Sequence, residues 1–311
     1  MSGVPIPAGA AAAAAQLSGL LLAPLVPGLV QHLKARLQGR RGPSPLQPYR
    51  ELRRLWGKSA VTVDGASAVY RLAPAVAAAS LGTCLLLVPV TAAAPGLGVG
   101  HDALALAGLL ALARFAVAAA AWDTANGFAL MGASRDLMIA VFVEITLVLG
   151  LAVVALTASS TDLAVMVGAT AGPGVWSTPV LALGATAFGI VTIAETGRQP
   201  VDNPDTHLEL TMVHEGPLLE YAGRDLAYLQ WAAAARHWVV LVLAAELFVP
   251  HPAAPWAQLA TLPVALAGLC AALAVTETLV AKMRILRVPR FLAAGALIAG
   301  LGVTASLVGL A

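Results

Sequence analysis

The sequence predicts an all-α integral membrane protein of about eight transmembrane helices, with an amphipathic interfacial helix in its first cytoplasmic loop. Hydrophobic residues make up 59% of the chain and charged residues only 11%, with a mean hydropathy of +0.84. Soluble globular domains carry charge at roughly 25% of positions. Apolar runs of about 18 residues or more can cross a bilayer as helices. Eight such runs occur, at 9–31, 70–92, 102–122, 136–158, 178–196, 235–251, 258–281 and 290–310.

These runs fill the length of the chain and predict a single polytopic membrane domain over 1–311. Two long connections stand out: a first cytoplasmic loop at 34–69, which holds the amphipathic helix, and an acidic fifth loop at 197–235. No Lys or Arg precedes the first run, and a basic cluster follows it. We therefore expect the run at 9–31 to be an anchor with its N-terminus outside, rather than a cleaved signal peptide.

Basic residues predict the orientation. Of the 18 Lys and Arg residues, all but Arg114 fall in the first, third, fifth and seventh connections between the runs, with Arg236 assigned to the fifth. Cytoplasmic loops retain Lys and Arg. We therefore expect a cell-membrane protein with its large loops in the cytoplasm and both termini outside.

The first loop contains a short amphipathic pattern. Tyr49, Leu52 and Trp56 recur at helical spacing, and basic residues occupy the opposite face. Such a helix is typical of the membrane interface. Two readings stay open, and both can hold: attraction to anionic lipid, or a docking ledge for a soluble partner.

The fifth loop concentrates acidic residues. Seven of the 16 in the chain lie between 194 and 225. Pro200 and Pro204 prevent a helix there and predict a turn, with Asp202 available to accept backbone amides. A helix is predicted to begin near Asp205, and Glu220 and Arg224 have the favourable spacing of an ion pair. His207 and His214 are expected at the solvent edge or against a partner.

Charged residues are also predicted inside the membrane. Arg114, Glu144 and Glu246 each lie about 12–15 Å from the cytoplasmic end of their runs, at 1.5 Å per residue. Charges at that depth are costly unless they are paired, so we expect an Arg114–Glu144 pair within a buried cluster. Glu195 and Glu277 lie near the cytoplasmic ends of their runs and are positioned to extend it. The cluster is either a set of static pairs that locks helix packing or a chain of protonatable sites.

The sequence contains neither a metal-binding motif nor a nucleic-acid-binding motif. Cys84 and Cys270 lie inside apolar runs without a CxxC pair or a nearby His, so we expect them to be packing residues and expect no metal site in this chain. No basic nucleic-acid-binding pattern is present.

Three motifs resemble one known family. They are Gln38-Gly-Arg-Arg-Gly-Pro43 with Leu46-Gln-Pro-Tyr49, Trp122-Asp-Thr-Ala125 with Gly132-Ala-Ser-Arg135, and Ala194-Glu-Thr-Gly-Arg198 continuing through Tyr221. Together they are similar to the subunit 1 (NuoH-type) family of respiratory complex I, and more closely to its hydrogenase branch, the subunit 4 of formate hydrogenlyases and related group 4 membrane-bound [NiFe]-hydrogenases. Gly197 and Asn203 depart from the complex I pattern and favour the hydrogenase branch.

The resemblance implies a non-catalytic membrane anchor in an oxidoreductase complex. It implies soluble hydrogenase large and small subunits as partners, carrying the nickel–iron centre and iron–sulfur clusters, and antiporter-like membrane subunits beside it. Acidic positions that line the family's coupling channel match Glu144, Glu195, Asp202, Glu209 and Glu220. Adding the charges chosen by depth, the expected ion-coupling residues are Glu144, Arg114, Glu195, Asp202, Glu209, Glu220, Glu246 and Glu277. The expected docking residues are Arg40, Arg41, Gln47, Tyr49, Arg53, Arg54, Arg135, Arg198, Glu215 and Arg224.

Two other functions remain as alternatives. A quinone-binding subunit 1 of a complex I-like NADH:quinone oxidoreductase would share the fold and most of these sites. A stand-alone secondary transporter would use its midplane charges to bind a substrate. The moving ion would be H⁺ or Na⁺, and the electron donor formate, carbon monoxide or another reductant.

Overall fold

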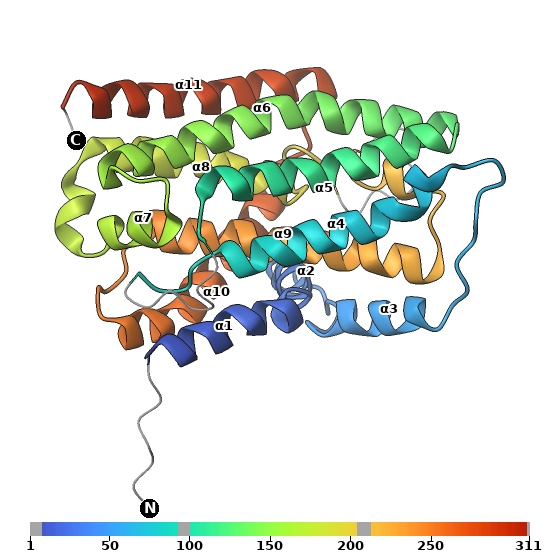
Figure 1. Cartoon of the computed structure of the whole chain (residues 1–311), viewed down its shortest axis with the longest axis horizontal. Helices are drawn as coiled ribbons and strands as arrows, with labels where there is room; N and C mark the ends of the chain where they lie inside the picture. The colour runs from blue at the N-terminus through green and yellow to red at the C-terminus, as the bar shows by residue number, and fades with distance from the viewer. Residues whose placement is uncertain (1–7, 93–99, 204–212, 310–311) are drawn as a thin grey trace, which may run out of the picture.

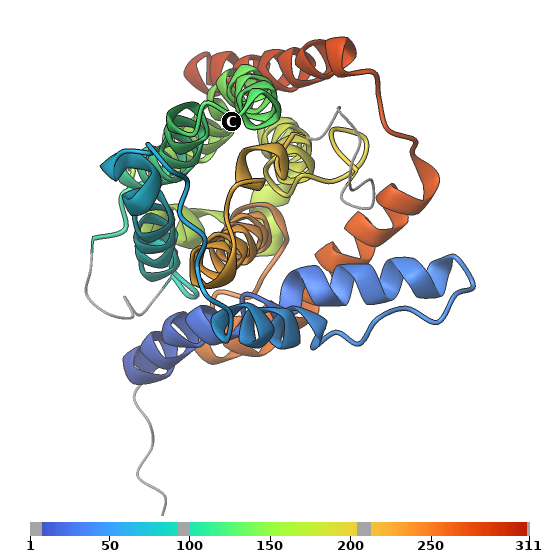
Figure 2. The same ribbon diagram turned by 90° about the vertical axis from the view of Figure 1, so that its right-hand side faces the viewer.

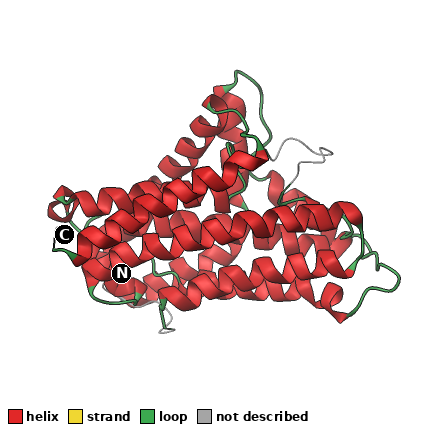
Figure 3. Ribbon diagram, turned by 90° about the horizontal axis from the view of Figure 1, so that it is seen from above, coloured by secondary structure: helices red, strands yellow, loops and turns green. Residues whose placement is uncertain are grey.

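The computed structural model describes residues 8–92, 100–203 and 213–309. This part of the chain forms α-helices, short 3-10 turns and loops, without a strand (Figures 1 and 3). The helices are α1 (Ala8–Leu22), α2 (Leu25–Leu37), α3 (Gln47–Trp56), α4 (Ala68–Leu87), α5 (Ala103–Asp123), α6 (Gly127–Ala158), α7 (Leu163–Thr170), α8 (Pro179–Glu195), α9 (Gly223–Phe248), α10 (Pro255–Leu279) and α11 (Val288–Leu307). The 3-10 turns are η1 (Pro173–Ser177), η2 (Gly216–Leu218) and η3 (Ile285–Arg287).

The helices confirm an all-α membrane fold. Six segments are long and apolar enough to cross a membrane, and the pair α1–α2 makes a seventh if it is counted as one span. Helix α8 is apolar but has only 17 residues. Each of the eight predicted runs therefore corresponds to a helix or a helix pair.

The first predicted span is not continuous. Helices α1 and α2 meet at a break and differ in direction by 62°. Pro24 stands at this break as the N-cap of α2. Proline lacks the N–H that a continuing helix would use, and its ring clashes with the preceding turn. The chain bends there, and α2 packs against α10 at one side of the bundle (Figure 2).

The sixth span begins earlier than the apolar run predicts, at Gly223 instead of 235. The first half of α9 is amphipathic: Arg224 and Gln230 are exposed, whereas Ala227 and Leu229 are buried. Average hydropathy misses such a segment because its polar face lowers the mean while its apolar face still packs. As a result, Arg236 lies inside the helix and not in the fifth loop.

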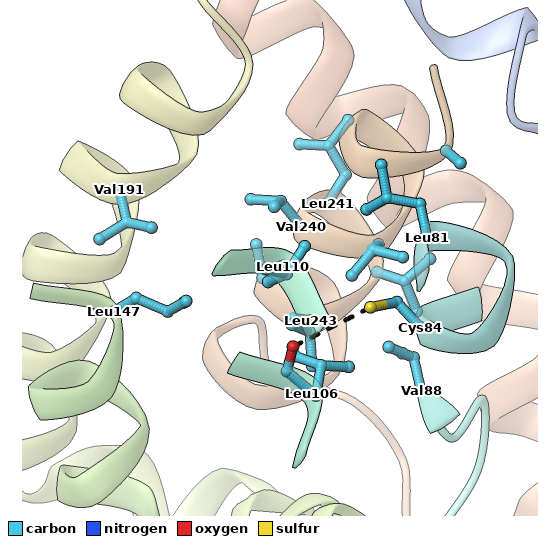
Figure 4. Close-up of a cluster of buried hydrophobic side chains, with 14 of the residues drawn as sticks. Leu81, Cys84, Val88, Leu106, Leu110, Leu147, Val191, Val240, Leu241 and Leu243 are labelled. Atoms are coloured by element: carbon cyan, nitrogen blue, oxygen red, sulfur yellow. Dashed lines mark hydrogen bonds between the residues drawn. The ribbon is translucent and has the colours of Figure 1, made fainter. Parts of the chain in front are cut away.

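Helix α9 is the centre of the bundle. In the apolar 18-residue stretch of α9, 67% of the residues are buried, compared with 22% in the corresponding stretch of the last span. It packs on α4, α8 and α10 (Figure 2). Figure 4 shows the apolar core between α4, α5 and α9, where Cys84 lies with its thiol directed at the Leu106 carbonyl, 3.9 Å away. Cys84 and Cys270 are both buried free thiols, consistent with packing roles.

The odd-numbered connections gather at one end of the bundle, which we call the loop end. Asp123 accepts hydrogen bonds from the Ser67 amide at 2.8 Å and the Tyr70 amide at 3.2 Å. The Tyr70 hydroxyl donates to the Glu220 carbonyl at 2.8 Å, which joins the first and fifth loops. The Met283 amide donates to the Pro200 carbonyl at 3.0 Å, which adds the seventh connection. The even connections meet at the opposite end, where the Leu163 amide donates to the His101 carbonyl at 2.7 Å.

The predicted amphipathic helix of the first loop is present as α3. Leu55 is buried on its inner face, and Trp56 contacts Tyr228 of α9 edge-on, with ring centroids 5.2 Å apart. Arg53 and Arg54 are exposed on the other side. Helix α3 is thus fixed to the loop end through its apolar face and presents its basic face outward.

Candidate functional site

Arg114 is the centre of a buried charge network. It lies midway along α5, with its side chain only 5% exposed. Its guanidinium contacts three carboxylates: Glu195 at 2.9 Å, Glu144 at 3.6 Å and Asp136 at 3.8 Å. The predicted Arg114–Glu144 pair is therefore present. Asp136 was missed because it lies only one residue after Arg135, at the start of an apolar run, where it reads as a loop residue.

Glu195 joins a second arginine to the network. The same carboxylate oxygen that accepts from Arg114 also accepts from Arg236 at 2.9 Å, and Glu195 is 2% exposed. Arg236 also donates to the Leu110 carbonyl of α5 at 3.4 Å. Sequence reasoning missed this role of Arg236 because it placed the residue in a loop. The helical start at Gly223 brings it level with the end of α8.

The turn after α8 positions Asp202. Gly197 adopts a left-handed conformation at φ +60°, which a side chain would strain. Asp202 then accepts hydrogen bonds from the amides of Val213 and His214, both at 3.3 Å. Its other oxygen contacts the Lys282 ammonium at 3.2 Å. The predicted turn around Asp202 is thus confirmed, and it clamps two ends of the fifth loop together.

His214 connects this turn to α6. Its Nδ1 lies 3.2 Å from Asp202 and its Nε2 lies 3.8 Å from Asp136. His214 was expected at the solvent edge or against a partner: its side chain is 28% exposed and both ring nitrogens lie near carboxylates of this chain, while a partner contact stays a prediction. Packing also fixes the ring over Gly197, where a Cβ atom would lie 3.1 Å from Nδ1. His207 lies outside the described residues.

The electrostatics of this loop favour charged forms. Burial raises the pKa of the Asp202 carboxyl, but His214, the Asn203 amide and Lys282 outweigh it and hold this pKa well below its ordinary value. Burial lowers the pKa of the His214 imidazole, but the hydrogen bond to Asp202 and the charge of Asp136 outweigh it and raise this pKa. The raised pKa favours the imidazolium form, which can pair with both Asp136 and Asp202.

A second buried cluster surrounds Glu277 near the end of α10. Arg198 contacts its two oxygens at 3.2 and 3.3 Å, and Lys34 of α2 contacts it at 3.4 Å. Arg198 was expected on the docking surface, but it is 3% exposed and bound within the protein. The backbone of Arg198 also accepts hydrogen bonds from Val201 and Asp202, so the two clusters share the turn after α8.

The remaining predicted coupling residues lie apart from the network. Glu246 is two residues from the end of α9, at the opposite end of the bundle, and bonds Gln258 instead of Arg114. The depth prediction placed it wrongly because it counted from Arg236 as if that residue began the helix. Glu220 pairs with Asn126 in place of the predicted Arg224. Glu209 lies outside the described residues.

The other predicted docking residues lie at the loop end. Arg40, Arg41, Arg53, Arg54, Glu215 and Arg224 are exposed there, whereas Gln47, Tyr49 and Arg135 are half-buried. Gln47 donates to Glu51 at 3.0 Å, and the Tyr49 hydroxyl donates to the Leu21 carbonyl at 2.6 Å. The Tyr49 contact attaches α3 to α1, and the Gln47 contact lies within α3. The exposed arginines take no part in these two contacts.

The main network holds one more carboxylate than it holds Arg and Lys side chains. Its carboxylates are Asp136, Glu144, Glu195 and Asp202, and its permanent cations are Arg114, Arg236 and Lys282. Four negative groups against three cations are neutral only when one further proton is held, by His214 or by a carboxylate. A low-dielectric site resists net charge, so movement of that proton is tied to the geometry of the contacts. Within the described residues, no group of three or more His, Cys, Asp or Glu side chains is placed to hold a metal ion.

Comparisons with known proteins agree with this architecture. A family model described as NADH dehydrogenase matches residues 11–306. Formate hydrogenlyase subunit 4 of Escherichia coli (strain K12) is 38% identical over 245 residues, 77% of this chain and 76% of that protein. Hydrogenase-4 component C of the same organism is 35% identical over 244 residues, 78% and 76% of the respective chains.

A solved structure shares the fold. One chain in the structure of the membrane-bound sulfane sulfur reductase, an archaeal respiratory membrane complex, superposes with a TM-score of 0.82 at 22% identity, covering 95% of this chain and 98% of that chain. Together with the family match over nearly the whole length, these relatives show that the chain is a multi-pass membrane protein of the NADH dehydrogenase subunit 1 (NuoH-type) family.

Proposed function

We propose that this chain is the membrane anchor and ion-coupling subunit of a multisubunit hydrogenase- or formate hydrogenlyase-like respiratory complex. The observation that carries the proposal is the unbroken series of charged contacts from Glu144, on α6, through Arg114, Asp136, His214 and Asp202 to Lys282 at the loop end. Names of the 35–38% identical relatives support a hydrogenase-type complex over other members of the family.

In this proposal the loop end is the cytoplasmic platform. Soluble hydrogenase large and small subunits would dock there and carry the nickel–iron centre and the iron–sulfur clusters, while antiporter-like subunits would lie beside the bundle in the membrane. The exposed arginines of α3 support this assignment, because guanidinium groups suit recognition of carboxylates on a partner. The large loops would then face the cytoplasm, as the positions of Lys and Arg predict.

Coupling would work through the single exchangeable proton. A redox change in the docked subunits would move the turn at 196–203, and His214 moves with it because its amide and ring both bond Asp202. In the structure Arg114 contacts three carboxylates, those of Asp136, Glu144 and Glu195. If Asp136 lost its contact with His214, it would compete more strongly with Glu144 and Glu195 for Arg114. Glu144, whose side chain is 39% exposed, is the member placed to release or accept a proton or to pair with Na⁺.

The test is Glu144→Gln and Asp202→Asn in the intact complex, reconstituted in vesicles. Positioned proton-transfer groups contribute roughly 10²–10⁴-fold, so we expect ions moved per hydrogen evolved to fall by about tenfold or more while hydrogen evolution persists. Glu51→Gln is the matched control, since the contacts of Glu51 among the described residues are with Arg54 and Gln47 of its own helix α3. Unchanged ion movement in both variants would refute the proposal.

A further inference from the structure

A separate polar site lies at the opposite end of the bundle, around Glu246. This side chain belongs to α9 and is 2% exposed. Its carboxylate accepts from the Gln258 amide of α10 at 2.5 Å. The Gln258 oxygen is held in turn by the Ala92 amide at 3.1 Å, which fixes the orientation of the amide group toward Glu246. Gln258 is itself 1% exposed, so the pair is enclosed.

Glu246 differs from the other buried glutamates in having no cation beside it. Glu195 contacts two arginines, and Glu277 contacts an arginine and a lysine. Among the described residues, Glu246 has no Lys, Arg or His within ion-pair distance. Burying a carboxylate costs several kcal/mol of hydration free energy, and without a counter-charge no ionic attraction offsets this cost. The neutral acid avoids that cost.

A small cavity is lined in part by Glu246. Its volume is about 20 Å³, and it is lined by Glu246, Pro250, His251, Thr261 and apolar side chains. A cavity needs roughly 10–15 Å³ to hold one water molecule. His251 is the other titratable group at this cavity, and its two ring nitrogens lie near the Val249 and Val167 carbonyls, at 3.0 and 3.3 Å. The neighbouring α7 contributes the Thr170 hydroxyl, which donates to the Glu246 backbone at 3.2 Å.

The site is joined to the charge network by one helix. Arg236 and Glu246 both lie on α9, ten residues apart in sequence, or about 15 Å along the axis. The first binds Glu195 near the loop end, and the second is one of the residues that line the outer cavity. A displacement of α9 would therefore act on both positions at once.

We propose that Glu246, Gln258 and the adjoining cavity form a proton-binding site at the end opposite the charge network, with Glu246 holding the proton and one water molecule in the cavity exchanging it. Its link to ion coupling rests on the proposed function, but the existence of the site does not. Gln258 orients the acid, and Thr261 and His251 are the polar groups available to the water.

Infrared difference spectroscopy of the purified complex tests the site directly. We expect a carbonyl stretch of a protonated carboxylic acid at neutral pH that shifts in D₂O and is lost in Glu246→Gln. Glu246→Asp should retain the band at a displaced frequency, which separates loss of the acid from misfolding. Glu51→Gln, which removes an exposed ion-paired carboxylate, should leave the band unchanged.

Two results would overturn the site: a spectrum in which Glu246→Gln removes no such band, or a band that fails to shift in D₂O. The outcome is independent of the ion-coupling test. If Glu144→Gln and Asp202→Asn leave ion movement intact, the proposed function fails while the Glu246 band can still be present.

Discussion

At the scale of single residues, His214 is the side chain that links the fifth loop to the buried charges of α6. It is the only described side chain that contacts both Asp136 on α6 and Asp202 in the fifth loop. Asp202 accepts hydrogen bonds from three backbone amides, those of Asn203, Val213 and His214, and also contacts the His214 ring, so its position follows that of the 213–214 segment. Protonation of this imidazole therefore strengthens the attraction between the fifth loop and α6.

The shifted pKa values predict how the turn at 198–203 responds to pH. The His214 pKa is raised, so its contribution is fully present below about 6.5 and is lost as pH rises through the folded value. The Asp202 pKa is lowered, so its contribution is present above its ordinary value and is lost only in strong acid. The turn should be most protected between these limits.

Hydrogen–deuterium exchange measures this protection. Corrected for intrinsic rates, exchange of the Val201 and Asp202 amides should accelerate above neutral pH, by about tenfold for each unit by which the His214 pKa is raised. His214→Gln should show fast exchange with no such pH dependence. A wild-type turn that is equally protected on both sides of the transition would show that His214 does not hold it.

At the scale of elements, two glycines set the contact between α6 and the fifth loop. The Gly132 backbone lies so close to η2 that a Cβ atom would stand 2.7 Å from the Gly216 Cα and 3.0 Å from Pro217. Real Cβ atoms do not approach backbone this closely. The close crossing keeps Asp136, one turn along α6 from Gly132, within reach of His214.

Gly132→Ala should separate these elements. Overpacking a tight contact costs about 1–3 kcal/mol, so we expect a lower melting temperature of the purified complex and weaker ion coupling. Gly108→Ala on α5 is the matched control, because a Cβ atom there meets nothing within 4 Å and alanine is the better helix former. Equal melting temperatures for the two variants would show that the crossing tolerates a methyl group.

At the scale of the whole molecule, the bundle has two unlike ends. The loop end holds the main network and the basic face of α3, and the opposite end holds Glu246 and the even-numbered connections. Helix α9 runs between them through the most enclosed part of the fold (Figure 2). This asymmetry fits a subunit that meets a soluble partner at one end only.

Reversal of charge on α3 tests that arrangement. Arg53→Glu with Arg54→Glu should weaken association with the soluble subunits, and electrostatic steering predicts a loss of about 10- to 1000-fold in the association rate that shrinks as salt is raised. Arg284→Glu with Arg287→Glu, two exposed residues of the seventh connection, controls for the change in net charge. Undiminished co-purification after both α3 changes would assign these arginines to anionic lipid instead.

The sequence by itself determined the helical membrane fold, the family and much of the network. Hydropathy located every span because burial in a bilayer demands long apolar runs. The spacing of Arg114 and Glu144 from the ends of their runs predicted their pairing, since two charges at one depth lower each other's cost. The pattern around Pro200 predicted the turn that holds Asp202.

Only the tertiary structure decided which charges meet. Arg236 and Asp136 lie at edges of apolar runs, where composition cannot separate a loop residue from a membrane one, and helix packing brought both to the network. His214 joined it because loop five folds back across Gly132, a contact between distant parts of the chain. Glu246 left it because α9 begins 12 residues before its apolar run, which moved this acid to the other end of the bundle.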